Sequence, residues 1–328
     1  MPSADQVKAL ISSLSDGDEG HFYAVAMQIA AHEARLGHGK LAEEIRALID
    51  KAKSRPRSHV KGAIPLARPK GEASELLAVS YPEVRLSDMV LAEDTRAKLE
   101  RVIKEQRSIQ AIRGRGLAPR RKILLSGKPG TGKTLTAYAL AGELGLPLFV
   151  VRLDGLITKF MGETAAKLRV IFETLSQTRG VYLFDEFDSI GTARDASNDV
   201  GEIRRIVNSF LQMVEQDHSD SLIVAATNQI GMLDPALFRR FDDVITYQLP
   251  TGELAVEALR VKLGLFKTYR IQWSKLATLA HGLSFADISR AAEDAIKDAI
   301  IHGRDRVTQP DISRAINDRK HALSQRKD

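Results

Sequence analysis

The stretch Gly127-Lys128-Pro129-Gly130-Thr131-Gly132-Lys133-Thr134 decides the fold of this chain. It fits the pattern G-x-x-x-x-G-K-[ST], in which glycines allow backbone N–H groups to turn toward bound phosphates. An apolar run over 122–126 precedes it, and a helical pattern over 133–144 follows it. The amino terminus of such a helix adds positive potential to the loop. The stretch therefore predicts a phosphate-binding loop between a strand and a helix, rather than an ordinary glycine-rich turn.

The side chains of this phosphate-binding loop (residues 127–134) have separate predicted roles. Lys133 is expected to reach the β- and γ-phosphates of a nucleotide, and the Thr134 hydroxyl is expected to bind Mg²⁺. The remaining predicted nucleotide contacts are Gly127, Pro129, Gly130, Thr131, Gly132 and Leu135.

An acidic pair, Asp185-Glu186, follows the apolar run 181–184. Parallel strands deliver the residues at their carboxyl ends to the edge of the sheet where nucleotides bind. Asp185 is therefore expected to hold Mg²⁺ through water, and Glu186 is expected to orient and deprotonate the attacking water. The alternative for an isolated Asp-Glu pair is a solvated strand end.

Five short runs rich in apolar and β-branched residues alternate with helical patterns along the middle of the chain. The runs are 123–125, 148–151, 181–184, 222–226 and 244–247, and the helical patterns are 133–144, 163–177 and 201–215. Apolar strands that alternate with helices predict a mostly parallel sheet that is covered on both faces. From residue 252 onward the pattern is helical only, which predicts a separate helical subdomain.

The segment before this region differs in pattern and in composition. Residues 4–53 carry three apolar stripes at helical spacing, which predict a small helical module. Residues 51–70 contain seven Lys or Arg, three Pro and no acidic residue. This composition is typical of a flexible or extended linker, with a contact for an anionic partner as the alternative. The expected domains are an N-terminal helical module 1–53 for partner or substrate recognition, a basic linker 54–75, an α/β domain 76–250 and a helical lid 251–328.

The overall composition limits the classes of protein that remain. The 328 residues carry a net charge of +6, 44% hydrophobic residues and no cysteine. This balance is that of a globular protein and excludes collagen-like and wholly disordered chains. Without cysteine the chain has no disulfides, Cys–zinc sites or Cys nucleophiles, which fits a reducing cytosol. With no apolar run near the length of about 18 residues and no secretory signal, we expect a cytoplasmic protein without a membrane span.

Together these motifs resemble those of the AAA family of ATPases, within the wider AAA+ class, over about residues 84–302. The resemblance implies an α/β fold, a P-loop NTPase parallel-sheet domain with a C-terminal helical lid, here joined to a small all-α N-terminal module. It also implies ATP and Mg²⁺ as cofactors. The stretch Ala226-Thr227-Asn228 resembles the family's first sensor, so Asn228 is expected to contact the γ-phosphate and the attacking water. A turn-forming Asn at a strand end is the alternative.

The segment Leu233–Asp242 resembles the part of the family that carries arginine fingers. The resemblance implies that a guanidinium from this segment reaches the nucleotide of the neighbouring subunit and stabilises transition-state charge. Here two residues are missing between the usual two arginines, so that Arg239 and Arg240 are adjacent. Arg240 is the expected finger, and Arg239 is expected either to act as a second finger or to point toward an acidic neighbour.

The stretch Lys159-Phe160-Met161-Gly162-Glu163 resembles the family's central pore loop. The resemblance implies that Phe160 and Met161 grip an unfolded polypeptide, while Gly162 lets the loop bend. A loop aromatic that packs on its own domain is the alternative. Residues 192–200 would then form a second pore loop.

Three further segments match the family less closely. Phe285 stands in the lid segment His281–Ile288 at the place where the family has a small glycine near the nucleotide. Asp88–Leu91 lies where the family cradles adenine with backbone atoms. The stretch Arg113–Lys122 holds five basic residues and no acid. We interpret it as mainly solvated surface, with a subunit contact as the alternative.

The resemblance implies a ring-forming homo-oligomer, expected to be a hexamer, which hydrolyses ATP and remodels, unfolds or translocates a protein substrate through a central pore. Leu36 stands where the helix of a zinc protease needs histidine, so a protease partner would be a separate chain. Two alternatives stay open. A nucleic-acid motor or loader is supported by the basic stretches 51–70 and 113–122. A non-motor adaptor would bind ATP only to gate assembly.

Overall fold

The computed structural model describes residues 71–156, 161–187, 200–228, 238–264 and 266–325, with the isolated residues 25–27, 29, 30, 38, 43 and 69. The chain divides into two compact units, Met1–Pro65 and Leu66–Asp328. In the first unit, Val25, Ala26, Ile29 and Ala30 are helical and buried, and they form part of one of the apolar stripes predicted within residues 4–53. Most of that module, and residues 51–68 and 70 of the basic stretch 51–70, lie outside the described residues.

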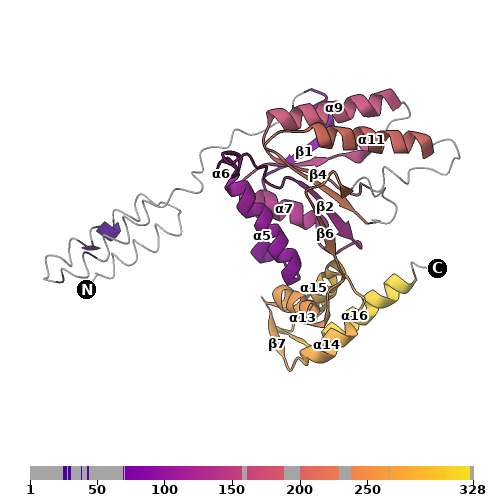
Figure 1. The fold of residues 1–328 in the computed structure, drawn as a ribbon. Helices are drawn as coiled ribbons and strands as arrows, with labels where there is room; N and C mark the ends of the chain where they lie inside the picture. The colour runs from indigo at the N-terminus through magenta and orange to yellow at the C-terminus, as the bar shows by residue number, and fades with distance from the viewer. Residues whose placement is uncertain are drawn as a thin grey trace. The chain divides into compact units, whose positions relative to one another are not determined.

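A six-stranded sheet forms the centre of the second unit, in the order β1-β3-β4-β5-β2-β6 (Figure 1). The strands are β1 (Leu77–Ser80), β2 (Lys122–Gly127), β3 (Leu148–Val151), β4 (Val181–Phe184), β5 (Leu222–Thr227) and β6 (Asp243–Tyr247). Strands β2 to β6 pair in parallel, which confirms the predicted sheet and its five apolar runs. The sequence pattern does not predict β1, which pairs antiparallel with β3 at one edge.

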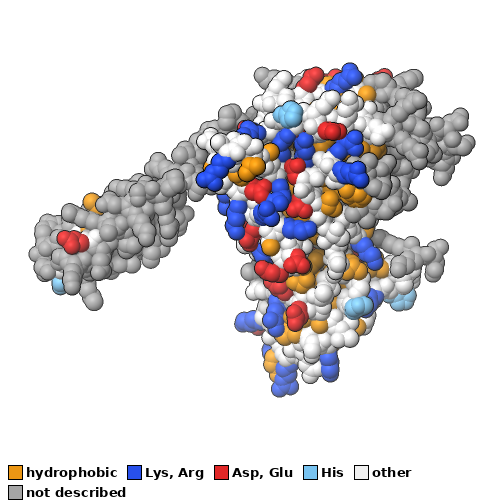
Figure 2. Space-filling model, viewed as in Figure 1, with side chains coloured by type: hydrophobic (Ala, Val, Ile, Leu, Met, Phe, Trp, Pro, Cys, Tyr) orange, Lys and Arg blue, Asp and Glu red, His pale blue; other side chains and the backbone are white. Residues whose placement is uncertain are grey.

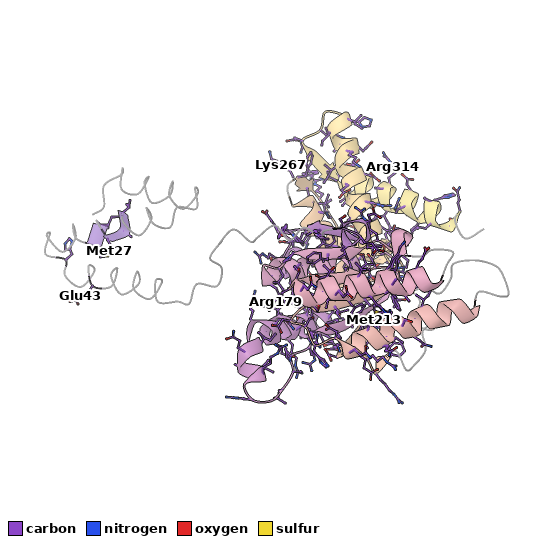
Figure 3. The ribbon with its side chains drawn as sticks, turned by 90° about the horizontal axis from the view of Figure 1, so that it is seen from above. Met27, Glu43, Arg179, Met213, Lys267 and Arg314 are labelled. Atoms are coloured by element: carbon purple, nitrogen blue, oxygen red, sulfur yellow. The ribbon has the colours of Figure 1, made fainter. Side chains whose placement is uncertain are left out.

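Helices cover both faces of the sheet (Figure 1). On one face, α9 (Met161–Gln177) and α11 (Val200–Gln216) pack against each other and run side by side in the view from above (Figure 3). On the other face, α5 (Glu93–Arg107) packs against α7 (Lys133–Leu144). The short elements of this domain are α4 (Ala73–Leu76), η1 (Leu86–Asp88), α6 (Ile109–Arg113) and α8 (Leu153–Leu156).

The central strands are apolar along their whole length because each face of the sheet meets a layer of helices. All residues of β4 and β5 are buried. Successive residues of β2 serve opposite layers, since Leu124 packs on the side of α9 and α11, and Leu125 packs on the side of α5 and α7. This double coverage explains why continuous apolar runs, rather than alternating ones, predict the strands.

The remainder of the second unit, which is the predicted lid, has its own core. Its elements are α13 (Gly252–Leu263), β7 (Lys267–Tyr269), α14 (Trp273–Leu279), α15 (Phe285–Ile301), β8 (Arg306–Thr308) and α16 (Gln309–Ser324). Leu259, Ile288 and Ile312, from three of these helices, are fully buried in one cluster. The prediction of helices alone was incomplete, because β7 and β8 pair in a small parallel sheet. Each strand has three residues, too few to show a periodic pattern.

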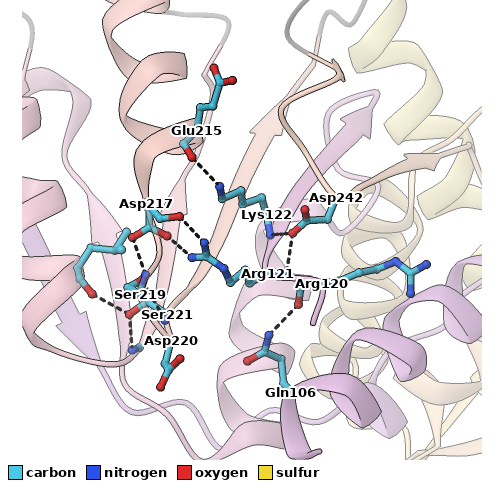
Figure 4. Close-up of polar contacts among 12 residues, drawn as sticks. Gln106, Arg120, Arg121, Lys122, Glu215, Asp217, Ser219, Asp220, Ser221 and Asp242 are labelled. Atoms are coloured by element: carbon cyan, nitrogen blue, oxygen red, sulfur yellow. Dashed lines mark hydrogen bonds and ion pairs between the residues drawn. The ribbon is translucent and has the colours of Figure 1, made fainter. Parts of the chain in front are cut away.

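The basic stretch Arg113–Lys122 is exposed over residues 113–118, as its composition suggests, but two of its arginines pair within the chain. The Arg121 side chain is 9% exposed and donates to the carboxylate and the carbonyl oxygen of Asp217 (Figure 4). Arg120 donates to Glu105 on α5. The interpretation as solvated surface is therefore wrong for these two arginines. Their acidic partners come from distant segments, which the local run could not reveal.

The surface of the second unit carries mixed charge on the face shown in Figure 2, where basic and acidic side chains are interspersed. This mixture offers little support for a continuous basic track along that face. None of the described helices combines the length and the apolar character that a membrane crossing requires.

Candidate functional site

The phosphate-binding loop joins the carboxyl end of β2 directly to α7. The neighbouring strands β4 and β5 run in the same direction, so Asp185, Glu186 and Asn228 follow them at the same edge of the sheet. A cavity of about 420 Å³ lies at this edge, within the range of small-ligand sites. Its lining brings together the predicted residues Pro129, Gly130, Thr131, Gly132, Lys133, Thr134, Leu135, Asp185, Glu186 and Asn228.

The other walls of the cavity come from two further parts of the second unit. Asp88–Val90, within the segment expected at adenine, forms one of them. The lid supplies the rest through Ala258, Val261, Lys262, Phe285, Ala286 and Ser289. Sequence patterns did not point to the α13 residues, although their spacing of i, i+3 and i+4 places them on one helical face. Phe285 lines the cavity half-buried, at the start of α15.

Two glycines of the loop are in close contact with other elements. Gly127 has a φ of 150°, and a Cβ there would lie 2.4 Å from the carbonyl oxygen of Tyr247 at the end of β6. Gly130 has a φ of 75°, and a Cβ there would lie 2.5 Å from Ser284 Oγ of the lid. The Ala286 N–H also donates to the Gly130 carbonyl oxygen over 3.0 Å. The main chain of the loop therefore touches both the sheet domain and the lid, at positions that exclude a side chain.

Lys133 is buried at the amino end of α7. Its Nζ donates to the carbonyl oxygens of Gly127 (2.8 Å) and Lys128 (3.0 Å). It also donates to Asn228 Oδ1 over 2.8 Å, which joins two predicted site residues that are 95 positions apart. These three acceptor oxygens are uncharged, and phosphate oxygens in their place would form charge-assisted hydrogen bonds.

Thr134 and Asp185 meet at the same edge of the sheet. Thr134 Oγ1 donates to Asp185 Oδ2 over 2.7 Å, and the Glu186 N–H donates to Asp185 Oδ1 over 2.9 Å. A hydroxyl and a carboxylate are the hard oxygen ligands that Mg²⁺ prefers. No cluster of three or more His, Cys, Asp or Glu with metal-site geometry occurs within the described ranges. Mg²⁺ commonly binds through one or two carboxylates together with substrate phosphates and water, and Thr134 with Asp185 suits that coordination.

Glu186 has an unusual backbone conformation. Its φ of 48° is left-handed, which makes it one of two non-glycine residues with positive φ among those described. Such a conformation costs about 1–3 kcal/mol and persists only where the surrounding structure imposes it. The exposed Glu186 side chain lines the cavity beside Asp185. Strain of this kind is concentrated at functional sites in proteins, which fits the predicted catalytic role.

Arg239 and Arg240 lie at the amino ends of the parallel strands, whereas the cavity lies at their carboxyl ends. They precede β6, which runs parallel to β2 and ends opposite Gly127. The five residues of β6, at about 3.3 Å each, separate that edge from the phosphate-binding loop. Arg240 Nε lies 3.0 Å from Glu215 Oε2, and Arg239 is exposed. Arg240 thus has an acidic partner within its own chain, because Glu215 in the last turn of α11 lies near it.

Several predicted residues lie outside the part of the chain that the structure describes. They are Lys159, Phe160 and the segments 192–199 and 233–237. Met161 and Gly162 begin α9, and their side chains are outside the description as well. The two pore loops therefore stay predictions.

Residues 123–249 match the family described as "ATPase family associated with various cellular activities (AAA)". A relative from Sinorhizobium fredii, described as an uncharacterized AAA family ATPase, is 36% identical over 97% of this chain and 96% of its own length. A proteasome-activating nucleotidase from Saccharolobus solfataricus is 35% identical over 73% of this chain, which spans 63% of that relative. An ATP-dependent zinc metalloprotease, FtsH 3 from Sphaerobacter thermophilus, is 31% identical over 76% of this chain, which spans 52% of that relative. With this cavity and these similarities, the chain belongs to the AAA family of ATPases.

Proposed function

We propose that this ATPase works as a ring-shaped homo-oligomer, a hexamer, in which each ATP lies between two subunits. One observation carries the proposal: the cavity and Arg240 lie at opposite edges of the same sheet. An arginine in that position is directed away from the cavity of its own chain. In a head-to-tail ring, the same arginine is available to the cavity of the adjoining subunit.

Within one subunit, five side chains divide nucleotide binding and hydrolysis between them. Lys133 exchanges its present acceptors for oxygens of the β- and γ-phosphates. Thr134 and, through water, Asp185 would hold Mg²⁺, which neutralises phosphate charge when it is bound. Glu186 orients the attacking water and accepts its proton, while Asn228 contacts the γ-phosphate and the same water. The backbone amides of the phosphate-binding loop complete the cradle.

The adjoining subunit is proposed to complete the site in the transition state. Arg240 leaves Glu215 and places its guanidinium beside the transferred phosphoryl group. In nucleotide hydrolases such a contact accelerates the reaction by about 10³–10⁵. The exposed Arg239 is proposed as a second contact at the same seam.

The proposed substrate is a protein that is remodelled, unfolded or translocated through the centre of the ring. The names of two relatives, a proteasome-activating nucleotidase and a metalloprotease, support a role in protein handling. Phe160, Met161 and Gly162 are the proposed pore residues. A protease partner would be a separate chain. The module 1–53 would select the substrate or partner in the cytoplasm. The linker 54–75 would connect this module to the α/β domain 76–250, which the lid 251–328 follows.

Mixing two inactive variants tests the shared site. Lys133→Ala damages the site of its own subunit and keeps the finger, whereas Arg240→Ala does the reverse. Each variant alone should lose most ATP hydrolysis, while Arg101→Ala, at an exposed arginine of α5, should keep it. In an equal mixture about a quarter of the seams combine an intact site with an intact finger, so activity should partly return. If subunits exchange and the mixture stays inactive, the shared site is wrong.

The Glu186→Gln variant tests the substrate class, because it should bind ATP without hydrolysing it. Imaging that assembly and identifying the molecule in its axis separates a protein substrate from a nucleic acid. The nucleic-acid alternative keeps the basic stretch 51–70 in its favour, whereas Arg120 and Arg121 already pair within the chain. Salt-sensitive binding of single-stranded DNA with DNA-stimulated hydrolysis would support that alternative. Absence of hydrolysis in the assembled wild-type protein would support the adaptor.

A further inference from the structure

The chain leaves the regular path of β4 in a turn over residues 185–187 that contains Glu186. Extending the register of β4 on β5 would place Phe187 opposite Asn228. Instead, the Phe187 N–H donates to the carbonyl oxygen of Ala226 over 2.9 Å. Phe187 has therefore advanced less far along β5 than the extended register would place it. The left-handed φ of 48° at Glu186 lies within this turn, at the point where the chain departs from the register of β4 on β5.

Phe187 is anchored on the far side of the turn by its side chain. It is 1% exposed, and its ring centroid lies 4.5 Å from that of Phe210 on α11. Phe210 in turn lies 4.8 Å from Phe184 and 5.9 Å from Phe172 on α9. Four aromatic rings thus connect the end of β4 to both helices on this face of the sheet.

On the near side of the turn, Asp185 is fixed as well. Its carboxylate accepts hydrogen bonds from Thr134 Oγ1 and from the Glu186 N–H. The Glu186 side chain itself is exposed at the cavity, so its own burial does not hold the backbone. The strained conformation is therefore imposed by the anchored residues on either side.

We infer that Phe187 is the positioning residue for Glu186: its anchoring among the aromatic rings keeps the glutamate left-handed and its carboxylate at the cavity. The inference rests on the proposed role of Glu186 in activating water. Without the anchor, Glu186 relaxes to negative φ, which residues with a side chain favour. Its carboxylate then leaves the attacking water, and a displacement of about 1 Å at a reacting group can cost about 10²-fold in rate.

The first test separates positioning from general packing. Phe187→Ala should lower kcat for ATP hydrolysis by about 10²-fold, whereas the Kd for a nonhydrolysable ATP analogue should stay at the wild-type value. Phe187→Leu, which keeps most of the apolar volume, should restore part of the rate and serves alone if the alanine variant does not fold. Phe172→Ala is the matched control, because it removes a ring of the same cluster away from the turn. Equal loss of kcat in the control, or parallel loss of affinity in the Phe187 variants, would overturn the inference.

The second test uses the Glu186→Gln background. If Phe187 acts through Glu186, adding Phe187→Ala or Phe187→Leu to Glu186→Gln should cause no further loss of the residual rate. A further loss as large as in the wild-type background would overturn the inference. If Glu186→Gln is inactive while the Phe187 variants are fully active, the positioning role of Phe187 is refuted and the proposed role of Glu186 still stands. Wild-type hydrolysis by Glu186→Gln would refute the proposed base itself.

Discussion

Removing the cation from the buried pair of Arg121 and Asp217 should strongly destabilise the second unit. The two side chains are 9% and 4% exposed, and the guanidinium donates to both the carboxylate and the carbonyl oxygen of Asp217 (Figure 4). The other carboxylate oxygen accepts a hydrogen bond from the Ser219 N–H over 3.1 Å. Arg121→Met keeps the apolar stem and the main-chain hydrogen bonds of residue 121 with Asp242 and Ile223. It leaves Asp217 as an uncompensated buried carboxylate, at a cost of about 3–5 kcal/mol.

Urea unfolding followed by far-UV circular dichroism measures this loss of unfolding free energy. Since 1 kcal/mol shifts Tm by about 2–4 °C in domains of about 150–250 residues, Tm should fall by about 6–20 °C. The single tryptophan, Trp273, lies in the lid. Its fluorescence therefore reports lid unfolding separately, and coincident transitions would show that sheet and lid unfold together.

The matched control for this prediction is Arg101→Met. Arg101 is 66% exposed and lies 3.2 Å from Glu105 one helical turn away, a pair that contributes about 0.3–0.5 kcal/mol. The double variant Arg121→Met/Asp217→Asn should lose less stability than the sum of its single variants, because no buried charge stays unpaired. If Arg121→Met costs no more than Arg101→Met, the burial-based reasoning is refuted.

Two further predictions concern the phosphate-binding loop and the lid. Gly130→Ala should weaken binding of an ATP analogue, because its Cβ would lie 2.5 Å from Ser284 Oγ of the lid. Gly116→Ala is the control, because Gly116 has the same φ of 75° and nothing within 4 Å of an added Cβ. Equal loss of affinity in both variants would contradict the steric explanation. Burial alone would raise the pKa of Asp311, but hydrogen bonds from Arg304 and Thr308 lower it from 3.8 to about 2. The stability from this carboxylate should be complete above about pH 4 and be lost toward pH 2. Asp311→Asn should remove this dependence from thermal unfolding of the lid followed by tryptophan fluorescence, and an unchanged acid dependence would speak against it.

The central strands could be predicted because burial on both faces makes each of them a continuous apolar run. The edge strand β1 could not, since Leu77–Ser80 is half-buried and is placed by pairing with β3, about 70 residues later in the chain. The exposed β7 has no apolar run at all. In both cases tertiary pairing rather than local preference determines the strand.

The residues that gather at the cavity could be predicted from the sequence wherever a motif specifies the residue type, whereas their roles toward phosphate and Mg²⁺ stay predictions. This holds for the phosphate-binding loop and for Asp185, which the structure brings to one cavity. The contacts of Lys133 with Asn228 and of Arg240 with Glu215 were not accessible, because they depend on which strands are neighbours. A local pattern carries no information on strand order.

Because the loop residue Gly130 abuts the first turn of α15, the size of the side chains in that turn is restricted. A bulkier residue at position 284 or 286 would press on the nucleotide cradle before it disturbed the folding of the lid. We therefore expect larger side chains to be tolerated less well at this turn than on the parts of the lid surface that lie far from the loop.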